Sequence, residues 1–128
     1  MMNFRFRKQE RIVRKKTIDK VFQEGKSFYS YSLRVNFLAN EQSPGTTPLK
    51  LLISVPKRIH RTAVARNRIK RLIREAYRIN KNSLLNIHTQ SIKQINVAFI
   101  YTNKNIISFE AINKEIQWII RQLEKKIN

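Results

Sequence analysis

The chain has 128 residues, of which 41% are hydrophobic, and this length and composition fit one compact domain with a single core. Its 27 lysines and arginines against 8 acidic residues give a net charge of +19, which favours an anionic partner, most simply nucleic acid. No apolar run approaches the roughly 18 to 20 residues that span a bilayer, and no apolar signal segment follows the basic N-terminus. We therefore expect a cytoplasmic protein with no membrane partner.

Candidate catalytic and metal-binding side chains are few. Cysteine is absent, which excludes disulfides, thiolate zinc sites and cysteine nucleophiles. The two histidines, His60 and His88, lie far apart in the sequence, and we interpret both as solvated surface residues. Because the acidic residues are scattered, a two-metal nuclease site of clustered carboxylates is not expected. The composition predicts no catalytic residue and no metal ligand on this chain, so that any chemistry belongs to a partner.

Residues 1–16 form a basic arm, which we expect to be mobile until it binds a partner, and residues 17–128 form the single domain. Thr17 is predicted to cap a short helix, and Gly25 is predicted to end it in the left-handed conformation. The apolar stripe of this helix consists of Ile18, Val21 and Phe22.

Two strands are predicted next. Residues 27–38 alternate with a period of two, as in a half-buried strand, and residues 49–55 are almost entirely apolar, as in a central strand that Pro56 ends. The polar residues 41–48 between them have the composition of a hairpin connection. The first strand presents Leu33, Val35 and Phe37 on one side and Arg34 and Asn36 on the other.

Residues 62–78 are predicted to form the main helix, with one apolar face and one basic face. When the sequence is projected as a helix, the apolar residues of this segment gather within about 140° of arc. The apolar face consists of Ala65, Ile69, Leu72, Ile73, Ala76 and Tyr77.

The rest of the chain supplies a connector, a strand and a helix. Residues 79–94 are a polar connector compatible with a short helix at 84–87, and residues 95–101 are a third strand. Ser108 is predicted to cap a C-terminal helix, and Trp118 lies off its apolar stripe, so that its role as an edge contact or an interaction surface stays open. The stripe consists of Phe109, Ile112, Ile116, Ile119, Ile120, Leu123 and Ile127. This order of elements predicts an α+β fold with helices packed on a small sheet.

The positive charge is concentrated on two segments. Residues 57–78 contain nine lysines and arginines and one acid, Glu75, and residues 1–20 contain eight more basic residues. Arginine dominates the helix, and its planar guanidinium can hold two phosphate oxygens or stack on a base. A solvated helix face would balance its bases with acids one turn away, and a calmodulin target or membrane-surface helix would not lie between two strands. We therefore favour an RNA-binding surface.

Several aromatic residues lie near the basic arm in the sequence. In a positive groove, aromatic rings can stack single-stranded bases, although each ring taken singly is more typical of a core. Both interpretations stay open for Phe22, Phe28, Tyr29, Tyr31 and Phe37.

The most specific signal is an ordered motif. A strand ends in Val55-Pro56-Lys57-Arg58, and after a short connection comes the run Arg66-Asn67-Arg68-Ile69-Lys70-Arg71-Leu72-Ile73-Arg74-Glu75-Ala76-Tyr77. This pattern closely resembles the signature of the ribonuclease P protein family. Val21-Phe22 followed by Gly25 resembles the family's first helix and the turn that ends it. The order of elements from Arg11 to the C-terminal helix agrees as well, so the resemblance covers nearly the whole chain.

The resemblance implies three main helices packed on a four-stranded mixed sheet, with a left-handed βαβ crossover, similar to a domain of a ribosomal protein. It also implies the protein subunit of an endoribonuclease whose active site is carried by RNA. That RNA uses Mg²⁺ to hydrolyse precursor tRNA and so removes the 5′ leader during tRNA maturation. The implied partners are ribonuclease P RNA and precursor tRNA, with no obligate protein partner, and Mg²⁺ is expected through the RNA.

By the same resemblance, two sets of residues bind RNA. The surface that docks on the catalytic RNA consists of Lys57, Arg58, Arg61, Arg66, Asn67, Arg68, Lys70, Arg71 and Arg74. The cleft that holds the 5′ leader, between the first helix and the sheet, consists of Arg11, Arg14, Lys15, Ile18, Phe22, Arg34 and Asn36. Ile18, Asn36 and Ile120 stand where relatives often carry aromatic residues, so that stacking is expected to rest mainly on Phe22.

Two other functions are compatible with these residues. A ribosomal or other structural RNA-binding protein would share the charge and the fold class, and it would stay with its particle. A protein-only nuclease would need its own acid, base or metal ligands, and it would cleave RNA without a partner.

Overall fold

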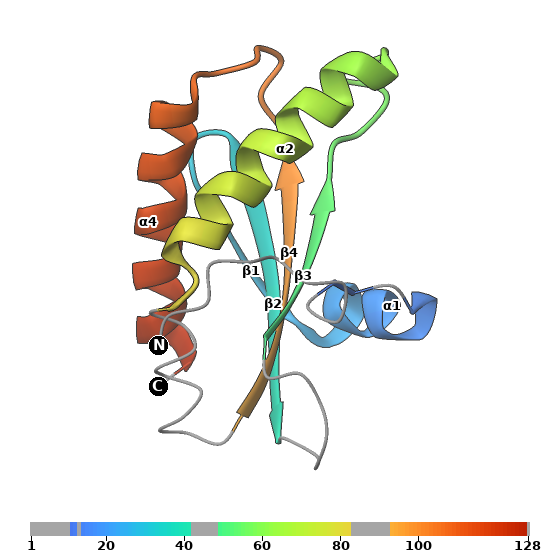
Figure 1. Ribbon diagram of the computed structural model, residues 1–128. Helices are drawn as coiled ribbons and strands as arrows, with labels where there is room; N and C mark the ends of the chain where they lie inside the picture. Colours follow the sequence, from blue (N-terminus) through green and yellow to red (C-terminus); the bar gives the residue numbers. More distant parts are fainter. Residues whose placement is uncertain (1–10, 13, 42–48, 83–92, 128) are drawn as a thin grey trace.

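The computed structural model describes residues 11–12, 14–41, 49–82 and 93–127 (Figure 1). These residues form three helices and four strands. In chain order they are α1 (Lys15–Glu24), β1 (Lys26–Tyr29), β2 (Leu33–Glu41), β3 (Leu49–Ser54), α2 (Ala63–Asn80), β4 (Lys93–Tyr101) and α4 (Phe109–Ile127). The short helix predicted at 84–87 and the second histidine, His88, lie outside the described residues.

The strands form one mixed sheet in the order β1-β2-β4-β3. β1, β2 and β4 pair antiparallel, whereas β3 runs parallel to β4, to which α2 connects it. In Figure 1 both strands point upward, α2 crosses in front of them and β4 lies to the left of β3, so the β3-α2-β4 crossover is left-handed. Nearly all such crossovers are right-handed. The predicted fold, with its unusual crossover, is confirmed.

Two predictions about the strands are wrong. β2 pairs with β4, so residues 41–48 do not connect the two strands of a hairpin. β3 is an edge strand, although its sequence is as apolar as that of a central one. The reason is that both of its faces are covered: Leu49 and Leu51 belong to the main core, and Leu52 packs against the cluster of Ile12 on the opposite face.

The predicted strand over residues 27–38 is in fact two strands, β1 and β2, joined by a turn at residues 30–32. This turn is fixed to α4 by the carboxylate of Glu115, which accepts hydrogen bonds from the Ser30 hydroxyl and, at 2.7 Å, from the backbone N–H of Ser32. The alternating pattern continues through the turn, so only these contacts between distant segments reveal the break.

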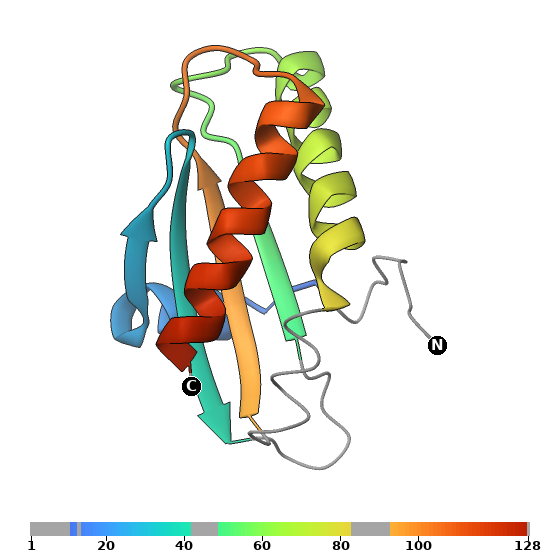
Figure 2. The ribbon, with the colours of Figure 1, turned by 90° about the vertical axis from the view of Figure 1, so that its left-hand side faces the viewer.

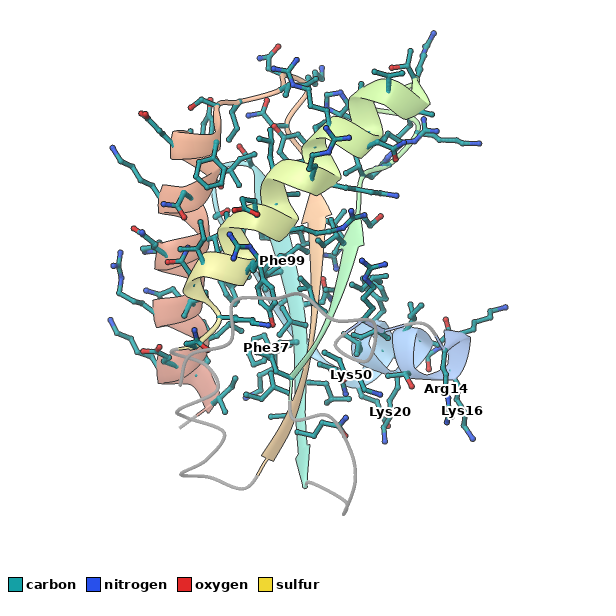
Figure 3. All side chains as sticks on the ribbon, in the orientation of Figure 1. Arg14, Lys16, Lys20, Phe37, Lys50 and Phe99 are labelled. Carbon is teal, nitrogen blue, oxygen red and sulfur yellow. The ribbon has the colours of Figure 1, made fainter. Side chains whose placement is uncertain are left out.

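The main core lies between one face of the sheet and the helices α2 and α4, which lie side by side (Figures 1 and 2). Phe37 of β2 and Phe99 of β4 point into it (Figure 3), and Phe99 meets Tyr77 of α2 edge to face with ring centroids 6.0 Å apart. The buried helical residues are Ile69, Ile73, Ala76 and Tyr77 of α2 and Ile112, Ile116, Ile119, Ile120, Leu123 and Ile127 of α4. Both predicted apolar stripes are therefore confirmed.

α1 lies on the opposite face of the sheet (Figure 2). Val21 of α1 and Ile12 form a small second cluster with Ala98 of β4. The helix begins at Lys15, before the predicted cap Thr17, and Arg14 takes the N-cap position without a side-chain hydrogen bond. The partly buried residues around this cluster are Ile18, Leu38, Leu52 and Ile100.

Gly25 ends α1 as predicted, but its conformation is extended, with φ −75° and ψ 165°, and is not left-handed. A Cβ atom at this position would collide with the carbonyl oxygen of Val21 and would lie 2.6 Å from that of Phe37. Glycine is required here because the end of the helix approaches the backbone of β2 too closely for a side chain.

The last residues of the predicted arm belong to the folded domain. The backbone N–H of Ile12 donates to the carbonyl oxygen of Leu51 at 3.0 Å, and Arg11 forms a parallel bridge with Leu51. Lys15 and Lys16 are already in α1. The segment at residues 11 and 12 therefore runs along the outer edge of β3.

The C-terminal helix begins as predicted, since the Ser108 hydroxyl accepts a hydrogen bond from the backbone N–H of Ala111 at 3.2 Å. Trp118 makes an edge contact: its ring is T-shaped to that of Phe28, with centroids 6.1 Å apart, and Phe28 meets Phe37 in the same way at 6.0 Å. Trp118 thus covers the margin of the core while part of its ring stays in solvent.

Candidate RNA-binding surface

α2 separates an apolar face from a basic one, and it begins where the sequence predicts. The Thr62 hydroxyl accepts a hydrogen bond from the backbone N–H of Ala65 at 3.2 Å and so caps the helix. The predicted docking residues of the helix are all exposed or half-buried: Arg66, Asn67, Arg68, Lys70, Arg71 and Arg74. The spacing in the sequence therefore brings these side chains together on the solvent side of α2.

Glu75 is the one acid in residues 57–78, and Arg78 pairs with it. The carboxylate accepts hydrogen bonds from Nε of Arg78 at 3.1 Å and from its Nη2. These hydrogen bonds from Arg78 lower the pKa of Glu75. Arg78 thus neutralises the carboxylate of Glu75 within the same helix. The positive charges of the other basic residues in the segment are not neutralised by this acid.

His60 is not a solvated residue, and that prediction is wrong. It is 7% exposed, its Nε2 lies 2.8 Å from the carbonyl oxygen of Asn103, and its ring lies against Tyr101 with centroids 5.7 Å apart. Because Tyr101 ends β4 and Asn103 follows it, these contacts fix the loop before α2 to the end of the sheet. The exposed basic side chains of this loop are Lys57, Arg58 and Arg61.

Arg66 has a structural role besides the predicted one. Its Nη1 donates to the carbonyl oxygens of His60 at 3.0 Å and Arg61 at 2.8 Å, so the side chain folds back on the loop. Replacing Arg66 would therefore loosen the loop as well as remove a charge. Arg68 and Arg71, which are exposed, are the better probes of RNA contact.

Arg11 lies on the α2 side of the molecule and not in the predicted leader cleft. With Lys70 and Arg74 it lines a hollow of about 150 Å³ whose other walls come from Ile12 and β3. Burial, followed by the positive charges of Arg11 and Arg71, lowers the pKa of Arg74. Cations held together in this way favour an anion such as phosphate beside them.

A second hollow, of about 290 Å³, lies on the α1 side of the sheet and is named the α1 pocket here. Four cations surround it, and Figure 3 shows them gathered around α1: Arg14, Lys16, Lys20 and Lys50. The other lining residues are Thr17, Leu38, Gln94 and Asn96.

The predicted leader-cleft residues of α1 and its cap lie on different parts of this region. Arg14 lines the α1 pocket, and Lys15 is exposed beside it. Ile18 is half-buried against the sheet. Phe22 is 40% exposed, so its ring is open to solvent and available for stacking.

The two predicted cleft residues of β2 are less accessible than expected. Asn36 is only 2% exposed, and Arg34 is half-buried with its guanidinium carbon 5.9 Å from the centre of the Tyr29 ring. Asn36 Oδ1 and Arg34 Nε are buried with no hydrogen-bond partner in the described part of the chain. The sequence indicated the correct face of the strand, but it did not show that this face would be covered.

Among the residues that line the α1 pocket, sequence reasoning named only Arg14, and the missed residues include Lys16, Lys20, Lys50 and Asn96. The first two are one helical turn apart, and the last two each place a polar side chain in an apolar strand, at a position that faces away from the core. Lysines one turn apart indicate a basic face on a helix, and a single polar residue in an apolar strand indicates that the strand has a polar face. Register brings them together, since Lys50 lies directly opposite Asn96 across β3 and β4.

The fold and the surface together define a class: an RNA-binding α+β domain with basic residues on both sides of its sheet. Among the described residues, no three His, Asp or Glu side chains form a group that could hold a metal ion. In the same part of the chain, no helix is both long and apolar enough to cross a membrane.

Comparison with known proteins gives the family. Residues 6–124 match the family model described as Ribonuclease P. A ribonuclease P protein component of Porphyromonas gingivalis is 36% identical over 115 residues, which cover 89% of this chain and 82% of that protein. One from Chlorobaculum tepidum is 33% identical over 118 residues, which cover 85% and 76%. The chain therefore belongs to the ribonuclease P protein family, the protein subunits of an endoribonuclease of tRNA processing.

Solved structures agree with the fold. The RNase P protein of Thermotoga maritima has a TM-score of 0.68 and 24% identity, with 88% of this chain and 96% of that chain covered. The RNase P protein of Staphylococcus aureus has a TM-score of 0.65 and 22% identity, with 88% and 94% covered. Because these sequence identities are low, the similarity concerns the fold alone, and this fold agrees with the one predicted from the sequence.

Proposed function

We propose that the basic face of α2, together with the loop before it, docks on ribonuclease P RNA. The observation that carries this proposal is the separation of the two sides of α2: buried apolar residues on one side, and exposed bases with a single paired acid on the other. Such a surface complements closely spaced phosphates. The proposed docking residues are Lys57, Arg58, Arg61, Arg66, Asn67, Arg68, Lys70, Arg71 and Arg74.

The RNA partner is proposed to carry the active site and the Mg²⁺ ions that hydrolyse precursor tRNA. Cations line the hollow beside α2 and the α1 pocket, and a surface of this kind attracts phosphate and repels a divalent metal ion. The protein then contributes by reducing the repulsion between two RNAs. Since both proposed ligands are RNAs of tRNA maturation, we assign the protein to the cytoplasm.

The α1 side is proposed to hold the 5′ leader of precursor tRNA. Arg11 lies on the α2 side of the β3 edge and Arg14 on the α1 side, so basic residues continue from one surface to the other. A single strand that leaves the α2 surface meets positive charge along this path. Phe22 adds an exposed ring on the same helix as the α1 pocket.

Reconstitution tests this function. The purified protein alone is expected to leave precursor tRNA intact, whereas adding it to a ribonuclease P RNA at low Mg²⁺ should raise the rate of leader removal at least about tenfold, equivalent to ~1.4 kcal/mol. The measurement is single-turnover cleavage of end-labelled precursor tRNA. Cleavage by the protein without RNA, or no effect of the protein on the RNA, would contradict the proposal.

Phe22→Ala is expected to weaken binding of leader-bearing precursor tRNA to the reconstituted enzyme by at least about fivefold, because stacking on one base contributes ~1 to 3 kcal/mol. Binding of mature tRNA, which has no leader, should not change. Tyr31→Ala is the matched control, since Tyr31 is also an exposed aromatic residue, at 86%, but lies in the β1–β2 turn. Equal losses for both tRNAs would show that Phe22 does not contact the leader.

A further inference from the structure

The α1 pocket contains a polar group that its cations do not explain. Asn96 is 4% exposed, lines the pocket, and has an Oδ1 atom with no hydrogen-bond partner among the described residues. Leaving a buried amide oxygen unpaired is unfavourable, because the atom has given up its hydrogen bond to water without gaining another. A ligand that donates a hydrogen bond to Asn96 would recover this free energy.

The position of Asn96 places it in the floor of the pocket. Its chain neighbours on β4, Ile95 and Val97, are in the main core, so Asn96 faces the α1 side. Across the sheet it lies opposite Leu38 on β2 and Lys50 on β3, which also line the pocket. Asn96 therefore lies below a rim of four cations.

This combination selects the ligand by its chemistry. A carboxylate would satisfy the cations but has no hydrogen to donate to Asn96. A nucleotide within an RNA strand has both parts: a phosphate for the rim, and a donor in its ribose 2′-hydroxyl or in an N–H group of its base. A hollow of about 290 Å³ is at the lower end of the range for small-ligand sites, which suits one nucleotide and not a duplex.

We propose that the α1 pocket binds one ribonucleotide of a single strand, with its phosphate among Arg14, Lys16, Lys20 and Lys50 and its donor group on Asn96. This inference rests on the proposed function, in which the strand is the 5′ leader, and it adds how the nucleotide is recognised. The hydrogen bond at the floor of the pocket lets the protein distinguish one nucleotide strand from another. Stacking alone would bind any single strand.

The test measures binding of labelled oligo(rU) and oligo(dU), which differ only in the 2′-hydroxyl, by fluorescence anisotropy. Wild type is expected to bind oligo(rU) about fivefold tighter, the effect of one neutral hydrogen bond. Asn96→Leu keeps the shape of the side chain without its acceptor, and it should bind oligo(rU) only as well as oligo(dU). Asn105→Leu, in an exposed loop after β4, is the matched control and should keep the preference.

The two donor sources give different results. If the donor is the base, Asn96→Leu loses about fivefold on both strands and nothing on an abasic strand. Either pattern supports the pocket, whereas wild-type affinity of Asn96→Leu for all three strands overturns it. Unfolding by urea confirms that the variant folds, and Asn96→Leu should be at least as stable as wild type because the unpaired amide oxygen is gone.

A second variant tests the rim independently of Asn96. Lys50→Gln should lower the affinity for both strands and reduce the log–log salt slope by about 0.7, the value for one single-strand phosphate contact, whereas Lys104→Gln should not. An unchanged slope for Lys50→Gln also overturns the proposal. If the protein stimulates cleavage in the reconstituted enzyme but the binding results are not obtained, only the proposal for the α1 pocket is wrong. If the protein does not stimulate cleavage while the pocket still prefers RNA, the proposed function is wrong.

Discussion

Replacing both Arg68 and Arg71 with alanine is expected to weaken binding of ribonuclease P RNA about a hundredfold at low salt. The two side chains are exposed on the basic face of α2, and each charge-assisted hydrogen bond to phosphate contributes roughly 1.5 kcal/mol. The salt dependence should flatten as well, because each lost phosphate contact on a duplex lowers the log–log slope by about 0.9. Filter binding at four or more salt concentrations measures both quantities.

The matched control removes the same charge elsewhere. Lys104 follows β4 and Arg121 is on α4, both are exposed, and neither belongs to the proposed RNA-binding surface. Their double replacement by alanine should change the affinity much less and leave the slope nearly the same. Equal losses for the two double variants would mean that net charge alone governs binding. An unchanged slope for the Arg68 and Arg71 variant would place the RNA elsewhere on the protein.

Gly25→Ala is expected to lower the free energy of unfolding by about 3 kcal/mol, at the upper end of the range for forcing extra atoms into a packed site. The added Cβ meets two backbone carbonyl groups, those of Val21 and Phe37, and neither can move away as a flexible side chain would. For a domain of this size the melting temperature should fall by roughly 10 °C. Thermal and urea unfolding followed by circular dichroism measure the loss.

Two further variants identify the cause. Ser27→Ala, at an exposed position of β1, should change stability by no more than about 0.5 kcal/mol. Gly25→Asn separates close approach from backbone conformation, since asparagine tolerates the left-handed region but still carries a Cβ. If the close approach of the backbone is the cause, Gly25→Asn should be at least as destabilising as Gly25→Ala. A milder effect of Asn would indicate that the glycine is needed for its φ angle.

Local patterns predicted the helices well and the sheet less well. The stripe of α2 and the cap at Ser108 follow from contacts within a few residues, so the sequence contains their cause. The pairing of β2 with β4 joins segments about sixty residues apart, and the composition of residues 41–48 says nothing about it. For the same reason the turn at residues 30–32, fixed by Glu115 from the far end of the chain, was not predicted.

The candidate site divides in the same way. The docking residues of α2 share one face because helical spacing places them there. The proposed leader residues depend on how α1 and the preceding segment lie on the sheet. Arg11 and Arg14 are three residues apart in the sequence but line hollows on opposite sides of β3. The sequence also gave no sign that α1 and its surroundings would cover Asn36, or that the second face of the sheet would use Lys50 and Asn96.

The segment at residues 11 and 12 has a consequence for self-association. β3 is an apolar edge strand, and an open edge of this kind can recruit a strand from another molecule. By donating to the carbonyl oxygen of Leu51, Ile12 occupies a hydrogen-bonding position in the middle of that edge. The opposite edge is the short strand β1, which begins with a lysine. Both edges of the sheet are thereby protected from pairing with a strand of another molecule. A variant lacking the N-terminal segment would lose that protection at β3.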